Sequence, residues 1–204
     1  KEDDHTKYKS GENWRDIELL EETIPLKNGR DTTIVIRLTH HGPIISDIHP
    51  LLKHENKAVS LAWTGHWITT EMDAWINLTT MKNWKDFTNA LELFGVPGQN
   101  IVYADIDGNI GWRPAVFVPI RREGFSMVPR PGHLSEYDWN GRVPYKDMPY
   151  LYNPKKGYIS TANNRTIDEG FPYYISGLWA DPSRGKRIDM RLKTDSLLTM
   201  TEMK

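Results

Sequence analysis

One short segment restricts the fold more than any other part of the sequence: an Asn-Gly pair between two runs of strand-forming residues. The runs cover residues 17–25 and 32–38 and are rich in β-branched and aliphatic side chains, and the pair between them is Asn28-Gly29. Asn-Gly readily adopts the positive φ values of a type I′ turn, which joins antiparallel strands. The segment therefore predicts a β-hairpin over residues 17–38.

Other strand-like runs predict more antiparallel sheet. The stretches 42–45 and 58–63 have the composition of strands that extend the first hairpin. Residues 100–113 indicate a second tight hairpin, and residues 157–161 indicate one further strand.

Helical spacing of apolar residues is less frequent. After Asn83, a common N-cap residue, apolar side chains recur at helical spacing over 84–94. A shorter helix is expected over 70–78, and an Asp-Pro pair is expected to open another over 181–192. The predicted fold class is therefore α+β, mainly antiparallel sheet with a few helices.

Composition excludes several classes of protein. The 204 residues include no cysteine, which excludes disulfides, thiolate metal sites and a cysteine nucleophile. With 26 basic and 27 acidic residues, the net charge of -1 gives no electrostatic reason to bind nucleic acid. No apolar run approaches the roughly 20 residues of a membrane-spanning helix. We therefore predict neither a nucleic-acid nor a membrane partner.

No linker or repeat divides the chain, so we expect one domain over residues 1–204. Its region 114–154 holds more than half of the 13 prolines and few periodic runs, which predicts an irregular excursion from the sheet. The chain opens at Lys1 and closes on a helix-like spacing from Leu197. From these two ends we expect a piece of a longer polypeptide.

Two polar motifs have some features of metal sites. Asp105, Asp107 and Asn109 alternate like the first ligands of a calcium loop, but the loop's glycine and final glutamate are not at the required positions. We expect a polar hairpin turn there instead. His40 and His41 are adjacent, so in a strand their side chains would point to opposite faces and would not share a metal. We predict no metal and no cofactor.

Other residues leave the function open. Carboxylates that could pair for glycosidase chemistry are Asp105, Asp107, Glu136 and Asp138. Trp112, Trp139 and Trp179 could stack on a sugar or an acyl chain, although such residues are more often core anchors. One open alternative is therefore a non-catalytic, β-rich module that binds a carbohydrate or a peptide.

Asn163 and Arg184 suggest a different kind of chemistry. Asn163 follows an expected strand, where its amide N–H could be presented to a developing oxyanion, although Asn-Asn also makes ordinary turns. Arg184 lies near the start of an expected helix, where a positive charge gains nothing from the helix dipole. Arg184 therefore either makes a functional contact at this position or is simply exposed to solvent. Local sequence alone does not connect the two residues.

A series of short motifs can be compared with known families as a set. They are Glu12-Asn13-Trp14, Glu22-Thr23-Ile24, Thr39-His40-His41-Gly42-Pro43-Ile44, Asn83-Trp84, Gln99 to Gly111, Trp139-Asn140-Gly141, Asn153-Pro154, Gly157-Tyr158-Ile159, Ala162-Asn163-Asn164 and Arg184-Gly185-Lys186-Arg187-Ile188. In order and spacing the set resembles the penicillin acylase (penicillin amidase) family over nearly the whole chain.

The resemblance implies an N-terminal-nucleophile hydrolase with an αββα sandwich, made as a precursor that cleaves itself into two chains. In that family a new N-terminal serine attacks the amide carbonyl, and its α-amino group serves as the base. This chain would be an internal fragment of the β chain. Its partners would be the remaining α- and β-chain segments and an N-acylated amide substrate. Alone it would be inactive, and open sheet edges would favour self-association.

Matching the family's motifs residue by residue gives two site residues. Asn163 is similar to the asparagine that stabilises the oxyanion, and Arg184 resembles the arginine that orients this part of the site. Some family members bind a structural calcium through an aspartate in the segment after the asparagine. Tyr173 and Tyr174 are the nearest equivalents here, so no calcium is predicted.

Overall fold

The computed structural model describes residues 6–27, 29–52, 57–122, 128–194, 198–199 and 201. It divides into two compact units: Lys1–Trp67 with Arg121–Asn140, and Ile68–Ile120 with Gly141–Lys204. We call them unit 1 and unit 2 and describe each by itself. The expectation of one domain over 1–204 stays a prediction. Asn28 of the predicted turn and the helix start expected at Leu197 lie outside the described residues.

Unit 1 is built on the hairpin that the sequence predicts. β3 (Glu18–Pro25) pairs antiparallel with β4 (Asp31–Thr39), and the short β5 (Gly42–Pro43) pairs with the end of β4. A separate hairpin joins β1 (Lys7–Ser10) to β2 (Asn13–Asp16), and η1 (Thr64–His66) is a 3-10 turn. The strand expected over 58–63 is reduced to a single bridge between Ser60 and Ile44, so that prediction is wrong.

The long hairpin leaves apolar side chains uncovered. Every residue of β3 is exposed, including Leu19 at 63% and Leu20 at 42%. On β4, Ile34 and Val35 are also exposed. Side chains of one strand alternate between the two faces of a sheet, so neither face of this hairpin is packed along its outer part.

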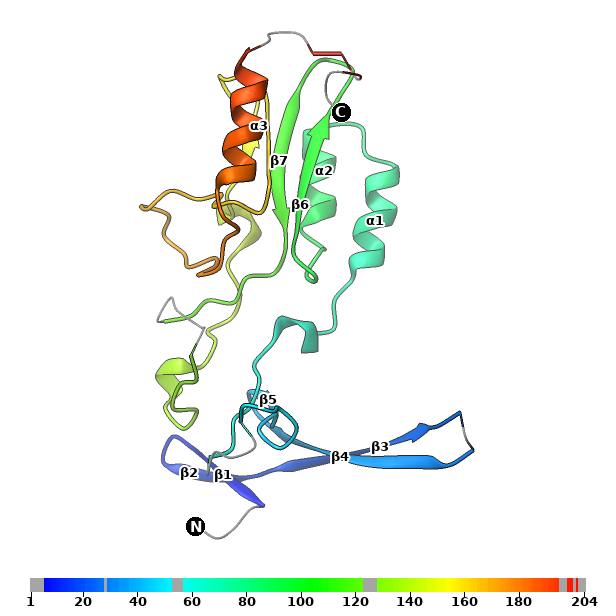
Figure 1. Ribbon diagram of the computed structural model, residues 1–204, viewed down its shortest axis with the longest axis vertical. Coiled ribbons are helices and arrows are strands. Elements are labelled where there is room, and N and C mark those ends of the chain that lie inside the picture. Colours follow the sequence, from blue (N-terminus) through cyan, green and yellow to red (C-terminus); the bar gives the residue numbers. More distant parts are fainter. Residues whose placement is uncertain are drawn as a thin grey trace. The chain divides into compact units, whose positions relative to one another are not determined.

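Unit 2 contains the main core. Its elements are α1 (Glu71–Thr79), α2 (Trp84–Leu91), β6 (Gln99–Ala104), β7 (Ile110–Ala115), η3 (Tyr145–Asp147), β8 (Leu151–Tyr152) and α3 (Ser183–Thr194). The 3-10 turn η2 (Ser135–Tyr137) belongs to unit 1. The antiparallel sheet has the order β6-β7-β8. In Figure 1 α1 and α2 lie beside the green β6–β7 hairpin, and α2 contacts β7. This mixture of antiparallel sheets and few helices confirms the α+β prediction.

The helix α2 shows how local sequence sets the packing of unit 2. Asn83 caps it as predicted, because its Oδ1 accepts a hydrogen bond from the backbone N of Asp86 at 3.0 Å. Phe87 and Leu91, four residues apart, both point into the core and are almost completely buried. Trp84 packs over Gly111 of β7 so closely that a Cβ at Gly111 would overlap the indole ring.

The start of α1 is joined to the end of the α2 region by one carboxylate. Glu71 accepts hydrogen bonds from the backbone N of Gly95 at 3.0 Å and of Val96 at 2.8 Å, and from Thr69 Oγ1 at 2.7 Å. Burial raises the pKa of the Glu71 carboxyl, but these hydrogen bonds outweigh it and lower the pKa from 4.5 to about 2. Glu71 therefore acts as an ionised bridge between the two helices.

The described residues between β7 and β8, and residues 157–161, contain less regular secondary structure than the hairpins. Between β7 and β8 the described residues form η2, η3 and an isolated bridge from Pro119 to Arg142. The prediction of a strand over 157–161 is wrong, because none of the described strands pairs with this stretch.

None of the described helices is both long enough and apolar enough to cross a bilayer.

Candidate active site

Asn163 lies at a sharp bend in unit 2. Its φ of 59° is in the left-handed region, which asparagine tolerates better than most residues. Asn164 fixes the bend from inside: its Oδ1 accepts from the backbone N of Ala162 at 3.0 Å, and its Nδ2 donates to the carbonyl of Arg165 at 3.1 Å. The backbone N of Ala180 also donates to the carbonyl of Asn163 at 2.9 Å. The bend therefore presents the Asn163 side chain from a defined position.

Arg184 reaches this bend from the first turn of α3. Its Nη2 donates to Asn163 Oδ1 at 2.7 Å and to the carbonyl of Ala162 at 2.7 Å. These two charge-assisted hydrogen bonds account for a cation at a position that the helix dipole disfavours. The two residues that the sequence could not connect are thus in direct contact.

The chemistry of the pair determines which amide group is left available. A guanidinium can only donate, so it must face the oxygen of Asn163, and the amide NH₂ then points away from Arg184. Among the described residues no acceptor takes a hydrogen bond from Nδ2 of Asn163. A fixed N–H donor without a partner is what stabilisation of a developing oxyanion requires.

A second contact ties the segment of Asn163 to α3. The Tyr158 hydroxyl donates to Asp189 at 2.5 Å, and Lys193 contacts the other oxygen of Asp189 at 2.7 Å. Hydrogen bonds from Lys193 and Tyr158 lower the pKa of Asp189, and the bond to Asp189 raises the pKa of the Tyr158 hydroxyl. Asp181, just before α3, accepts from the backbone N of Ser183 at 2.9 Å. The segment of Asn163 is therefore joined to α3 by the Tyr158–Asp189 contact as well as by Arg184, and Asp181 supports the start of the helix.

The helix passes close to the bend at Gly185. A Cβ added at Gly185 would lie 3.1 Å from Oδ1 of Asn164. A small cavity of about 260 Å³ opens on this side and is lined by charged and polar groups, among them Lys156, Lys186 and Asp189.

Two other candidates from the sequence, Asp105 and Trp112, have structural roles. Asp105 is engaged by Tyr103 Oη at 2.8 Å and by the Asn109 side chain at 2.8 Å, which confirms a polar hairpin turn. Trp112 is only 3% exposed and donates from its indole N to Asn100 at 3.0 Å. Trp112 is therefore a core anchor and is not available to stack on a ligand.

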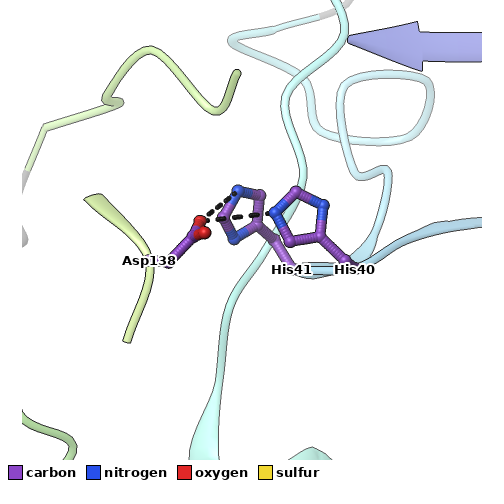
Figure 2. Close-up of side chains that lie close together, drawn as sticks. All are labelled: His40, His41 and Asp138. Atoms are coloured by element: carbon purple, nitrogen blue, oxygen red, sulfur yellow. Dashed lines mark hydrogen bonds and ion pairs between the residues drawn. The ribbon is translucent and has the colours of Figure 1, made fainter. Parts of the chain in front are cut away.

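The prediction that the side chains of His40 and His41 point to opposite faces is wrong. The two residues form the turn between β4 and β5, so the alternation of a strand does not apply, and their rings lie side by side with centroids 3.8 Å apart. Figure 2 shows both rings directed at Asp138, whose Oδ1 lies 3.3 Å from Nε2 of His40 and 3.5 Å from Nε2 of His41. Burial, followed by the neighbouring His41, lowers the pKa of His40 against the opposing effect of Asp138. Gly42 directly after the pair was the sequence signal for a turn.

Comparisons with known proteins agree on one family. The family model described as penicillin amidase matches residues 1–204. Penicillin G acylase of Escherichia coli is 32% identical over 191 residues, which is 91% of this chain and 22% of that protein. Acyl-homoserine lactone acylase QuiP of Pseudomonas fluorescens is 29% identical over 181 residues, 89% of this chain and 22% of that protein. The chain thus spans about a fifth of the length of these relatives.

A solved structure agrees at the level of fold. The thermostable penicillin G acylase from Alcaligenes faecalis superposes with a TM-score of 0.79 at 24% identity, covering 99% of this chain and 36% of that one. The likeness extends over both units of the chain.

Proposed function

This chain belongs to the penicillin amidase family, and on that premise we propose that it carries the oxyanion-stabilising part of an enzyme that cleaves linear amide bonds. In this proposal Asn163 is the catalytic residue of the chain. Its Nδ2 donates a hydrogen bond to the carbonyl oxygen of the substrate as negative charge develops there. Arg184 is a positioning residue that holds the amide in the required orientation.

The single observation that carries the proposal is the contact between Arg184 Nη2 and Asn163 Oδ1 at 2.7 Å. It directs the remaining amide group of Asn163 away from the guanidinium and leaves it without an acceptor among the described residues. An oxyanion donor contributes most when it is oriented before the substrate arrives, because no reorganisation is then needed at the transition state.

The attacking group lies outside this chain in our proposal. We expect an N-terminal serine, released by cleavage of a longer precursor, whose α-amino group acts as base. A donor and a guanidinium can bind an oxyanion but cannot create one, so residues 1–204 alone should show no amidase turnover. The name "Penicillin acylase 2 proenzyme", given to one relative from Pseudomonas at 29% identity, fits a precursor of this kind.

The proposed substrate is an N-acylated compound. The relatives are named for cleaving penicillin G and acyl-homoserine lactones, and in both an acyl group is joined to an amine by an amide. The other segments of the full-length enzyme are the proposed partners of this chain.

The test is a substitution in the full-length enzyme. Loss of one oxyanion donor typically lowers kcat by about 10²–10³, so Asn163→Ala should do so with little change in KM. Asn153→Ala is the matched control, because Asn153 is also an asparagine with positive φ, 46°, but hydrogen-bonds within the β7–β8 region. If Asn163→Ala retains more than half of the wild-type kcat, Asn163 is not the oxyanion donor. A full-length gene with no Ser, Thr or Cys at a cleavage site would instead favour the binding module.

A further inference from the structure

A cluster of metal-ligating side chains lies in unit 1, and the proposed amidase reaction does not use it. It consists of His40, His41 and Asp138, whose ligand atoms all lie within 4.8 Å of one another. Figure 2 shows the two imidazoles and the carboxylate converging from separate parts of the chain. The cluster borders an open cavity of about 850 Å³ that is also lined by Trp63, Trp67 and Trp139.

The distances within the cluster fit a four-coordinate metal. Nitrogen and oxygen ligands lie about 2.0–2.1 Å from Zn²⁺, so two ligands of a tetrahedral site are about 3.3 Å apart. The observed separations from Asp138 Oδ1 are 3.3 Å to His40 Nε2 and 3.5 Å to His41 Nε2. The ligand atoms of the two histidines lie within 4.8 Å of one another, so these two must approach further when an ion binds. The fourth ligand would be a water from the cavity.

The turn that carries the histidines is fixed before any metal arrives. The backbone N of His40 donates to the Tyr8 hydroxyl at 3.1 Å, and the Tyr8 ring stacks on the imidazole of His40. Thr39 Oγ1 accepts from the backbone N of His41 at 3.2 Å and donates to the carbonyl of Gly42 at 3.2 Å. Such supporting contacts orient metal ligands and raise affinity.

The present contacts of the three groups are shared. Asp138 Oδ1 faces both imidazoles, and His41 Nε2 also lies 3.0 Å from the carbonyl of Gly132, which can only accept and therefore takes the hydrogen of this nitrogen. A divalent cation bound to His41 displaces that hydrogen and ends the contact with Gly132, in exchange for a direct bond to each of the three groups. The carboxylate of Asp138 supplies the negative charge that favours a cation at this position. The donor set of two imidazoles and one carboxylate suits Zn²⁺ better than calcium or magnesium.

We propose that His40, His41 and Asp138 bind one Zn²⁺ ion, which joins the β4–β5 turn to the segment Arg121–Asn140. The ion crosslinks two stretches of unit 1 that are nearly 100 residues apart in sequence, His40 and Asp138 being separated by 98 positions. It is independent of the oxyanion group of unit 2, and failure of either proposal leaves the other intact.

The experiment is calorimetric titration of the chelator-treated, dialysed protein with ZnCl₂. We expect one site per chain, at least tenfold weaker binding in His40→Ala, His41→Ala and Asp138→Asn, and a higher Tm with Zn²⁺ in the wild type only. His49→Ala is the matched control, because His49 is an exposed histidine of unit 1 outside the cluster. Absence of stoichiometric binding, or equal affinity in all variants, overturns the proposal.

A spectroscopic measurement on the wild type covers the case in which the histidine variants do not fold. Co²⁺ in a four-coordinate site with imidazole ligands gives visible absorption bands much stronger than those of the hydrated ion. We expect these bands to saturate at one Co²⁺ per chain and to disappear when Zn²⁺ is added. A spectrum that remains that of hydrated Co²⁺ overturns the proposal.

Discussion

Removal of the Arg184 guanidinium should reveal how much of the proposed catalysis depends on orienting Asn163. The perturbation is Arg184→Ala in the full-length enzyme, which deletes both hydrogen bonds from Nη2, each 2.7 Å long. Charge-assisted hydrogen bonds contribute about 1.5–3 kcal/mol. Arg184 is exposed, so solvent screening reduces this to roughly 1–2 kcal/mol for the orientation of the amide.

That free energy converts directly into a rate. With a factor of ten for every 1.36 kcal/mol or so, Arg184→Ala should lower kcat by about 5- to 30-fold, less than the loss expected for Asn163→Ala. If Arg184 acts only through Asn163, the double variant should be no slower than Asn163→Ala alone, because the group that Arg184 orients is already missing.

The assay is steady-state hydrolysis of a chromogenic N-acyl amide by the four proteins of this cycle, with thermal unfolding of each as the control for stability. Arg184→Lys provides an intermediate point, since an ammonium keeps the charge but lacks the planar fork of the guanidinium. Multiplicative losses of kcat in the double variant would refute the positioning role, and so would an unchanged kcat in Arg184→Ala.

Three further predictions concern the fold. Glu71 has a folded-state pKa of about 2 against an ordinary 4.5, so the stability that it contributes is present above pH 4.5 and is lost as the pH falls toward 2. The free energy of unfolding in urea should therefore fall less steeply with decreasing pH in Glu71→Gln than in the wild type. An identical fall in both proteins would contradict this. Gly111→Ala should lower the free energy of unfolding by about 1–3 kcal/mol because the new methyl overlaps Trp84, whereas Gly170→Ala, with no atom near its Cβ, should have little effect. Residues 1–204 alone should self-associate through the exposed β3–β4 hairpin; light scattering that finds only monomer at high concentration would argue against it.

Local sequence predicted the β3–β4 and β6–β7 hairpins and the helices because each carries its own signal. The β-branched runs of the first hairpin, and the Asn83 cap before Phe87 and Leu91, depend on interactions between near neighbours. The β1–β2 hairpin was not predicted. Residues 157–161 have a strand-like composition, but a strand also needs a partner, and the Tyr158 side chain instead bonds to Asp189 on α3. Pairing at such a sequence distance cannot be judged from composition.

The contact within the candidate site was not predictable from local sequence. Asn163 and Arg184 were singled out from the sequence and given roles by the family resemblance, and these roles stay predictions, whereas the 2.7 Å contact between the two side chains depends on the fold. The histidine cluster was missed because a strand was expected at His40 and His41. In a tight turn the side chains of neighbouring residues can lie on one side, and the third member, Asp138, comes from a remote segment.

The left-handed backbone at Asn163 allows the shape of the bend and the chemistry of its side chain to be changed separately. Few residue types accept a φ of 59° without strain. Glycine would preserve the bend while deleting the amide, and aspartate would preserve it while exchanging a donor for an acceptor. Shape and chemistry at this corner can therefore be altered one at a time, which makes it a natural starting point for changing the proposed hydrogen-bond donor.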